Sequence, residues 1–222
     1  MTLARPSTRL VLAVSLDGRL APPQGGAAQI GGRGDRRVLE EALAWADGAL
    51  LGAETLRRHG TTCLIHAPDL LVARISEGRA PQPIALVASR SGAFPPALPF
   101  FQQPLERWLL APAEVACGAA ALGFTRGVPL ADWLAALQQL AALGVKRLVV
   151  LGGAALAGSL LADGLLDELQ LTLCPRLLGG PHTWLPAGVV LDPSRWELRE
   201  QRLLEGGEVL MRYGAVLSGP GD

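Results

Sequence analysis

Short apolar runs recur along the chain, separated by stretches whose apolar residues follow a helical spacing. The run at 148–151 is too short for a buried helix and rich in valine, so it predicts a strand buried on both faces. Other runs predict strands at 10–15, 49–51, 84–88, 108–111, 123–125 and 169–173. Two later runs, at 196–203 and 208–215, flank the turn Glu205-Gly206-Gly207 and predict an antiparallel hairpin.

Helical segments are predicted between these strands at 36–46, 54–59, 129–143 and 154–161. Asp35 is a candidate N-cap for the first, because its carboxylate can accept a hydrogen bond from a free amide of the first turn. Strands that alternate with helices and end in a hairpin predict a three-layer α/β fold. Its mostly parallel central sheet is closed by a C-terminal antiparallel hairpin. The length predicts a single domain over residues 1–222, with an ordered core at about 9–217.

Charge and composition narrow the possible partners. Lys and Arg together number twenty, as do Asp and Glu, so the sequence offers no basic surface for nucleic acid. Charged or amide residues interrupt each apolar run before it could span a membrane, and the N-terminus does not resemble a signal peptide, which predicts a cytoplasmic protein. The three cysteines lie far apart and the three histidines have no paired spacing, so we expect no metal site.

A double glycine, Gly152-Gly153, lies between the strand at 148–151 and the helix at 154–161. Without Cβ atoms the backbone can turn sharply there and lie close to a ligand. The first amides of the following helix have no intrahelical partner, and with the helix dipole they can bind an anion, most often phosphate. Alternatively, the two glycines only make a tight turn between strand and helix. The residues alone leave both interpretations open.

Two other segments end strands in a similar way: Ser15-Leu16-Asp17-Gly18 and Gly52-Ala53-Glu54-Thr55. In an open α/β sheet, ligands collect outside the carboxyl ends of the strands. Taken singly, Asp17-Gly18 is well explained by an ordinary turn, and Thr55 by a helical residue without a ligand. Three such segments at three strand ends together predict a nucleotide site.

The same segments resemble motifs of one enzyme family. Residues 15–21 (SLDGRLA) resemble the S-[LM]-D-G-[KR]-[IL]-A opening of the riboflavin-biosynthesis pyrimidine reductases, and 50–56 (LLGAETL) resemble that family's V-G-A-x-T-[VL] segment. Residues 150–161 (VLGGAALAGSLL) are similar to its E-G-G-x-x-L-x-x-x-L-L segment. Its G-L-[VL]-D-E-L and P-x-[LI]-[LI]-G-G motifs have counterparts at 164–169 and 175–180. The motifs follow the family's order, and the resemblance covers most of the chain.

The resemblance implies a dihydrofolate-reductase-like fold, NADPH as hydride donor and a homodimer. The implied reaction reduces the ribosyl group of 5-amino-6-(5-phosphoribosylamino)uracil to ribityl, with the protein orienting the nicotinamide. Ser15 and Asp17 are the substrate-side candidates, and Asp17 is also the candidate catalytic residue, as polar support for the substrate or a proton. The implied cofactor-binding residues are Ala13, Thr55, Gly152, Gly153, Ala154, Ala155, Leu156, Ala157, Gly158 and Ser159.

The chain departs from the family pattern mainly where relatives recognise substrate. Leu151 replaces the carboxylate that often precedes the double glycine, and Leu43 replaces a phosphate-binding arginine. His59 begins the segment that replaces the family's D-D-P, Ala27 replaces a loop serine, and Gln29 replaces an aromatic residue. Six basic residues are expected either to supply a different phosphate contact or to be only solvated surface charges: Arg33, Arg36, Arg57, Arg58, His59 and His66.

Two other functions stay open on sequence alone. A reductase of the same fold could act on another pteridine-like or carbonyl substrate, as the lost carboxylate at Leu151 suggests. The second alternative is a non-catalytic nucleotide-binding module. We expect no deaminase activity in this chain, because the sequence lacks the H-x-E and P-C-x-x-C signature of the zinc deaminases.

Overall fold

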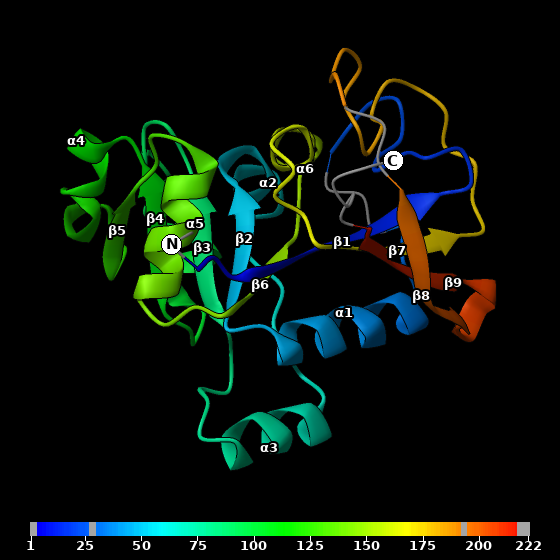
Figure 1. Cartoon of the computed structure of the whole chain (residues 1–222), viewed down its shortest axis with the longest axis horizontal. Coiled ribbons are helices and arrows are strands. Elements are labelled where there is room, and N and C mark those ends of the chain that lie inside the picture. The colour runs from blue at the N-terminus through cyan, green and yellow to red at the C-terminus, as the bar shows by residue number, and fades with distance from the viewer. Residues whose placement is uncertain (1–3, 27–29, 192–194, 217–222) are drawn as a thin grey trace.

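One sheet organises the computed structural model, which describes residues 4–26, 30–191 and 195–216 (Figure 1). Within these ranges the sheet has nine strands in the order β5-β4-β3-β2-β6-β1-β7-β9-β8. The strands are β1 (Ser7–Ser15), β2 (Gly48–Gly52), β3 (Ile84–Ala88), β4 (Arg107–Ala111), β5 (Arg126–Pro129), β6 (Arg147–Val150), β7 (Glu168–Cys174), β8 (Trp196–Leu203) and β9 (Val209–Ala215).

Most of the sheet is parallel. Every neighbouring pair from β5 to β7 runs parallel, whereas β9 is antiparallel to β7 and β8 is antiparallel to β9. The first strand lies near the middle, with Leu10 opposite Val150 of β6 on one side and Leu169 of β7 on the other. The predicted α/β fold, with a closing antiparallel hairpin, is confirmed.

Helices cover both faces of the sheet. Leu10 and Leu12 of β1 pack on the face covered by α5 (Trp133–Ala142) and α6 (Ala154–Ala162), whereas Val11 packs on the face covered by α1 (Arg33–Trp45). The short helices α2 (Ala53–His59) and α4 (Ala113–Ala116) cover the same face as α1, over β2 to β4. Three short 3₁₀ turns complete the described chain: η1 (Pro99–Gln102), η2 (Ala119–Leu122) and η3 (Glu205–Gly207).

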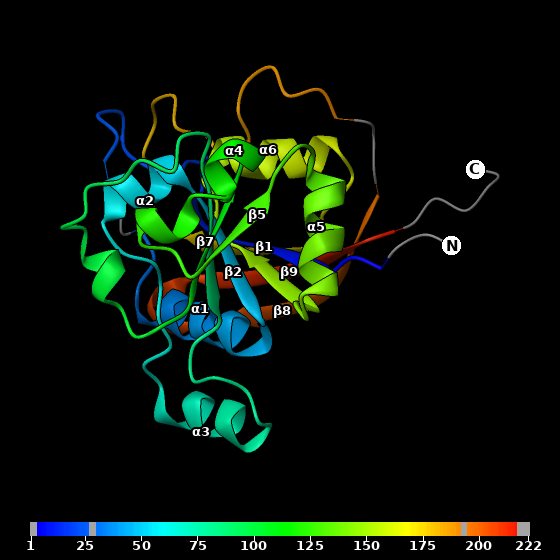
Figure 2. The same ribbon diagram turned by 90° about the vertical axis from the view of Figure 1, so that its left-hand side faces the viewer.

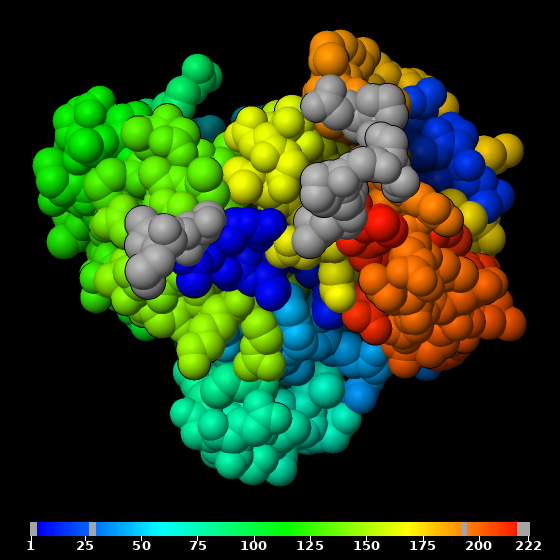
Figure 3. All heavy atoms as spheres, in the orientation of Figure 1, coloured from blue at the N-terminus to red at the C-terminus, as the bar shows by residue number. Residues whose placement is uncertain are grey.

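The helix α3 (Pro68–Ser76), which sequence analysis missed, projects beneath α1 in Figures 1 and 2 and forms a knob in Figure 3. Arg74 fixes it, because its buried guanidinium donates hydrogen bonds of 3.2, 3.0 and 2.6 Å to the carbonyls of Leu43, Ala44 and Ala46. Carbonyls in the last turn of a helix lack intrahelical donors, and Arg74 supplies a donor to these three. No helix in the described ranges is long and apolar enough to cross a membrane.

The start of α1 corrects one sequence prediction. The helix begins at Arg33 with Gly32 as its N-cap residue, so Asp35 lies inside the first turn and is not the cap. Glu208, which directly precedes β9, supplies the missing acceptor. Its carboxylate accepts hydrogen bonds from the amides of Gly32 and Asp35, the latter at 2.8 Å.

Two boundaries near β5 are also corrected. The strand predicted at 123–125 is wrong, because Gly123 ends the η2 turn with φ of 84° and β5 begins at Arg126. The helix predicted from residue 129 begins at Trp133. Asp132 precedes it as the N-cap, and its side chain accepts a 2.7 Å hydrogen bond from the amide of Ala135.

Candidate active site

A cavity of about 1540 Å³ lies at the carboxyl ends of the parallel strands. Residues that follow β2, β3, β4, β5 and β6 line it, together with the middle of β1. This is the position at which open α/β sheets bind ligands. The lining residues at or just after the ends of these strands are Gly52, Ala53, Thr55, Ala88, Ser89, Arg90, Ser91, Pro112, Leu130, Leu151, Gly153 and Ala154.

The cavity has two ends and a rim, set by the strand order. The β3–β5 end comprises Ser89, Arg90, Pro112, Leu130 and Trp133. The α1 end comprises the first turns of α1 and the segment at 61–66, and the rim comprises residues of two loops at 20–26 and 182–183. The α1 end is formed by Asp35, Arg36, Leu39, Glu40, Cys63, Leu64 and His66.

The double glycine lies between these two ends. Gly152 has φ of 85°, a conformation that L side chains rarely adopt, and the peptide bond between the two glycines is cis. A Cβ on Gly153 would lie 3.1 Å from Oγ1 of Thr55, so the backbone and this hydroxyl form a narrow cradle. No side chain caps α6, whose first amides therefore stay available to an anionic ligand.

Most predicted cofactor residues line the cavity. They are Ala13, Thr55, Gly153, Ala154, Ala155, Leu156 and Ser159. Gly152, Ala157 and Gly158 do not: Ala157 is fully buried in the core, and Gly158 packs against Pro186 and Val189. Ser159 accepts a 2.9 Å hydrogen bond from the indole N–H of Trp133, which joins α6 to the β3–β5 end.

Ser15 and Asp17 lie outside the cavity lining. The Asp17 carboxylate accepts hydrogen bonds from the hydroxyl of Ser15 at 2.6 Å and from the amides of Leu178 and Gly179 at 3.1 and 2.7 Å. These bonds, led by that from Ser15, lower the pKa of Asp17 to about 2. The geometry gives Asp17 a loop-anchoring contact, and its catalytic role stays a prediction.

Sequence analysis missed Asp35 as a site residue, because its position before α1 resembled a cap. In the structure it lines the α1 end. Burial raises the pKa of the Asp35 carboxyl, and the nearby charge of Glu208 raises it further, while a hydrogen bond with Thr172 opposes the rise. A carboxyl group perturbed in this way inside a cleft is typical of functional sites. The sequence around Asp35 does not reveal these surroundings, because Thr172 of β7 and Glu208, just before β9, lie far from Asp35 in the chain.

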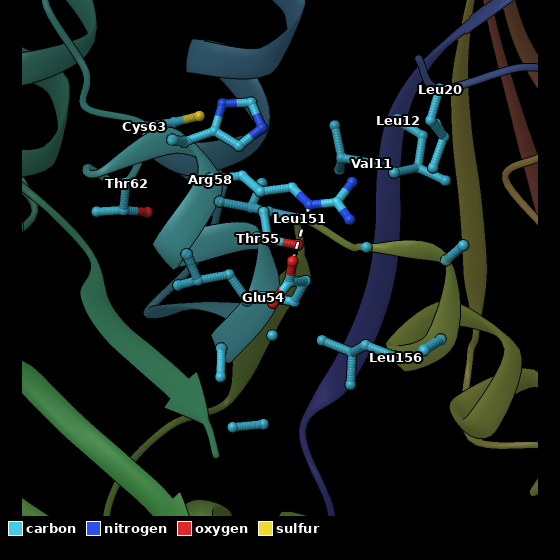
Figure 4. A pocket seen from close by; sticks show the side chains of 18 of the residues that line it. Val11, Leu12, Leu20, Glu54, Thr55, Arg58, Thr62, Cys63, Leu151 and Leu156 are labelled. Carbon is cyan, nitrogen blue, oxygen red and sulfur yellow. Dashed lines mark hydrogen bonds and ion pairs between the residues drawn. The ribbon is translucent and has the colours of Figure 1, made fainter. Parts of the chain in front are cut away.

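The last turn of α2 carries three basic side chains, Arg57, Arg58 and His59, of which Figure 4 labels Arg58. Arg57 donates to the carbonyl of Ala93 and lies over the Phe94 ring, whereas Arg58 bonds Glu54 at 2.9 Å and points across the cavity toward β1. Burial, aided by the charge of Arg58, lowers the pKa of His59.

The positions that depart from the family pattern lie in different surroundings. Leu43 is fully buried in the core beside Val11 and Val149 and does not line the cavity. Leu151, His59 and His66 do line the cavity. Ala27 and Gln29 lie outside the described residues. Among the residues that the structure describes, no cluster of His, Cys, Asp or Glu could hold a metal ion.

Comparison with known proteins places this geometry in context. The family model of the RibD C-terminal domain matches residues 6–210. The 2,5-diamino-6-ribosylamino-4(3H)-pyrimidinone 5′-phosphate reductase of Methanothermobacter thermautotrophicus is 27% identical over 79% of this chain and 81% of that protein. Riboflavin biosynthesis protein RibD of Escherichia coli is 28% identical over 78% of this chain, which spans only 49% of that relative.

Solved structures share the fold at low sequence identity. A pyrimidine reductase-like protein from Corynebacterium diphtheriae has a TM-score of 0.77 and 21% identity, with 96% of this chain and 93% of that chain covered. Dihydrofolate reductase from Enterococcus faecalis has a TM-score of 0.51 and 12% identity, with 94% and 96% covered. The expected dihydrofolate-reductase-like fold is confirmed.

Fold and site together define a reductase that takes its hydride from a nicotinamide cofactor. A cavity at the strand ends with a glycine cradle fits such a dinucleotide. The chain belongs to the RibD C-terminal domain family. The expected class, an oxidoreductase of riboflavin biosynthesis, is thereby confirmed.

Proposed function

We propose that this chain uses NADPH to reduce the ribosyl group of 5-amino-6-(5-phosphoribosylamino)uracil to ribityl. One observation carries the proposal: the strand-end cavity has the Gly153–Thr55 cradle between the β3–β5 end, which includes Arg90, and the α1 end, which includes Asp35. A dinucleotide and a pyrimidine can lie end to end in such a cavity. Family membership supports the riboflavin-pathway substrate class.

The centre of the cavity suits the pyrophosphate of the cofactor. The uncapped amides that begin α6 at Ala154 and Ala155 would donate to its oxygens, and the absence of a Cβ on Gly153 allows the close approach. The Thr55 hydroxyl lines the same space and would add a donor. Ala13 of β1 and Leu156 of α6 would bound the space beyond, where the nicotinamide supplies the hydride when bound.

The choice of NADPH over NADH rests on the β3–β5 end. Arg90 is exposed and lines the cavity directly after β3, next to the Ser89 and Ser91 hydroxyl groups. A guanidinium between two hydroxyl-bearing residues suits the extra 2′-phosphate that distinguishes NADPH. We expect Arg90→Ala to lower the preference for NADPH over NADH about tenfold, the cost of one charged hydrogen bond, without changing kcat at saturation.

The α1 end suits the pyrimidine. Asp35 offers a carboxyl group that burial shifts toward its neutral form, so it could both donate to and accept from the polar edge of the base. Leu39 and Leu64 line the same end and would exclude water from the ring. Ser15 and Asp17 remain part of the proposal as substrate-side residues. They would act by holding the loop at Leu178 and Gly179 in place.

A second pyrimidine is favoured by one comparison. The archaeal relatives are named as reductases of 2,5-diamino-6-ribosylamino-4(3H)-pyrimidinone 5′-phosphate, which still carries the amino group that deamination removes. The two candidate substrates therefore differ at the base, where Asp35 would bind. Purified protein should be assayed with each of them for NADPH oxidation and ribityl product.

The assay separates the possible functions. Turnover of either pyrimidine supports the proposal, and the ratio of kcat/KM values decides between them. NADPH oxidation by pterins or carbonyl compounds alone would mean a reductase with another substrate. NADPH binding without any turnover would leave a nucleotide-binding module.

We further propose a cytoplasmic homodimer without nucleic-acid partners. The β8 strand lies at the edge of the sheet and exposes Leu198 and Leu203, and a second copy of the chain would cover such an edge. Sedimentation velocity tests the dimer, which should persist at micromolar concentration and dissociate in a Leu198→Lys, Leu203→Lys double variant. A monomeric wild-type protein would contradict it.

A further inference from the structure

Two nitrogen-bearing side chains, those of Arg58 and His182, approach the same glycine at the rim of the cavity. Gly25, in the loop at 20–26, has φ of 72°, and a Cβ built on it would lie 3.3 Å from Nε2 of His182 and 3.9 Å from a terminal nitrogen of Arg58. Arg58 reaches this point from α2, and His182 from the loop after β7. Three segments far apart in the sequence thus bring two nitrogen-bearing groups to one small space.

Both groups keep donors available in this space. Arg58 uses Nε for its bond to Glu54, while its terminal nitrogens have no hydrogen-bond partner among the described residues. The His182 backbone carbonyl accepts from Leu20, but its ring is not hydrogen-bonded to any described residue. Figure 4 shows the Arg58 guanidinium directed over the cavity toward Val11 and Leu12 of β1.

The two rim loops contribute no carboxylate to this space. Neither rim loop, at 20–26 or at 178–184, contains an acidic residue, and Glu54 is the carboxylate that bonds Arg58. The two loops also hold each other in place, because Arg19 forms an isolated antiparallel bridge with Thr183 and the Leu20 amide donates to His182. The Asp17 carboxylate fixes the second loop through Leu178 and Gly179. The two donors are therefore positioned before a ligand arrives.

From this geometry we infer that Arg58 and His182 bind the phosphate monoester of the substrate. The inference rests on the proposed reductase function and deepens it, because it makes the 5′-phosphate a recognised group. Relatives carry an arginine where this chain has the buried Leu43, and Arg58 of α2 would supply a guanidinium to the cavity instead. A guanidinium fork and an imidazole N–H are both suited to phosphate oxygens.

The kinetic test compares the pyrimidine 5′-phosphate with its dephosphorylated riboside in Arg58→Gln, His182→Asn and wild-type protein. We expect each variant to lose about tenfold or more in kcat/KM for the phosphorylated substrate, as for loss of a charged hydrogen bond, with little change for the riboside. Arg199→Gln is the matched control, since Arg199 pairs with Glu197 on the exposed β8 strand. Equal losses on both substrates, or no loss on either, would overturn the inference.

A binding test separates this inference from the proposed function. Inorganic phosphate should perturb the ring NMR signals of His182 saturably in wild-type protein, and this response should disappear in Arg58→Gln. Such a response would support the anion site even if neither pyrimidine were reduced, in which case the proposed reaction alone would fail. Absence of any phosphate response in folded wild-type protein would overturn the site.

Discussion

The amide of Gly179 donates a 2.7 Å hydrogen bond to the carboxylate of Asp17, 162 residues earlier in the chain. Leu178 donates to the same carboxylate, so one side chain fixes a turn of the rim loop. Asparagine offers one acceptor oxygen in place of two, and Asp17→Asn must lose part of this contact. We expect turnover to fall roughly tenfold or more, with NADPH affinity changing little.

A protease experiment tells how Asp17 acts. If the loss of turnover comes with new cleavage at 175–184, Asp17 works by holding the loop. Lowered kcat with wild-type protease resistance would instead support a catalytic role. Wild-type turnover together with wild-type melting would remove Asp17 from the site.

Acid stability provides a second test of the same carboxylate. Because the folded-state pKa of Asp17 is lowered from 3.8 to about 2, its contribution to stability is present above pH 4 and disappears as the pH falls through about 2. Asp17→Asn should therefore lower Tm at pH 6, and the difference from wild type should shrink toward pH 2. Thermal melts across this range measure it, and a difference independent of pH would contradict the assignment.

The glycine cradle predicts a defect in cofactor binding. A side chain on Gly153 would meet Thr55 and fill the space in front of the α6 amides. We expect Gly153→Val to weaken NADPH binding at least about tenfold, the cost of a lost charged hydrogen bond, in a fluorescence titration. Gly118→Val is a suitable control, because Gly118 has ordinary φ and only a 3.6 Å contact. Unchanged titration in a folded Gly153→Val protein would remove the glycine pair from the site.

The cap of α1 predicts that the C-terminal hairpin stabilises the α1 end of the cavity. Glu208→Ala removes the acceptor for the amides of Gly32 and Asp35. The free energy of unfolding in urea should fall by about 1–2 kcal/mol, as for the loss of an N-cap. Glu205→Ala is the control, since Glu205 is exposed and pairs only with exposed Arg33 among the described contacts. Equal stability of the two variants would show that the cap contributes nothing.

Arg74 predicts a larger effect on stability. Arg74→Leu removes a buried donor that bonds three carbonyls at the end of α1, and the expected loss is about 2–4 kcal/mol. Arg74→Lys should restore only part of it, because an ammonium group lacks the planar fork that reaches several carbonyls at once. Urea unfolding measures both variants, and full rescue by lysine would mean that charge alone matters.

The strands were predictable because their signal is local. The run at 148–151 and the alternation at 169–173 coincide with β6 and β7, since buried strands need apolar side chains whatever their neighbours. The strand predicted at 123–125 lies three residues before the edge strand β5, because Gly127 and Pro129 weaken the strand signal of β5 itself. Gly127 is needed there, since a Cβ would collide with the carbonyl of Ala116, and proline is tolerated at a sheet edge.

The site residues also differ in whether the neighbouring sequence reveals them. Gly153 and Thr55 line the cavity as expected, because a glycine pair and a strand-end threonine carry their signal in neighbouring residues. The roles proposed for Asp35 and Arg58 depend instead on Glu208 and His182, which come from distant segments of the chain. The helix α3 was missed, although Pro68 at its first turn and Asp69 after it are ordinary start signals.

The place of β1 in the sheet has a consequence during synthesis. The β1 strand pairs with β6 and β7, so during synthesis it must wait for residues 147–174 before it gains a partner. The cap of α1 waits longer still, until Glu208 emerges. A nascent chain that already contains the glycine cradle therefore lacks a finished α1 end until Glu208 has been made.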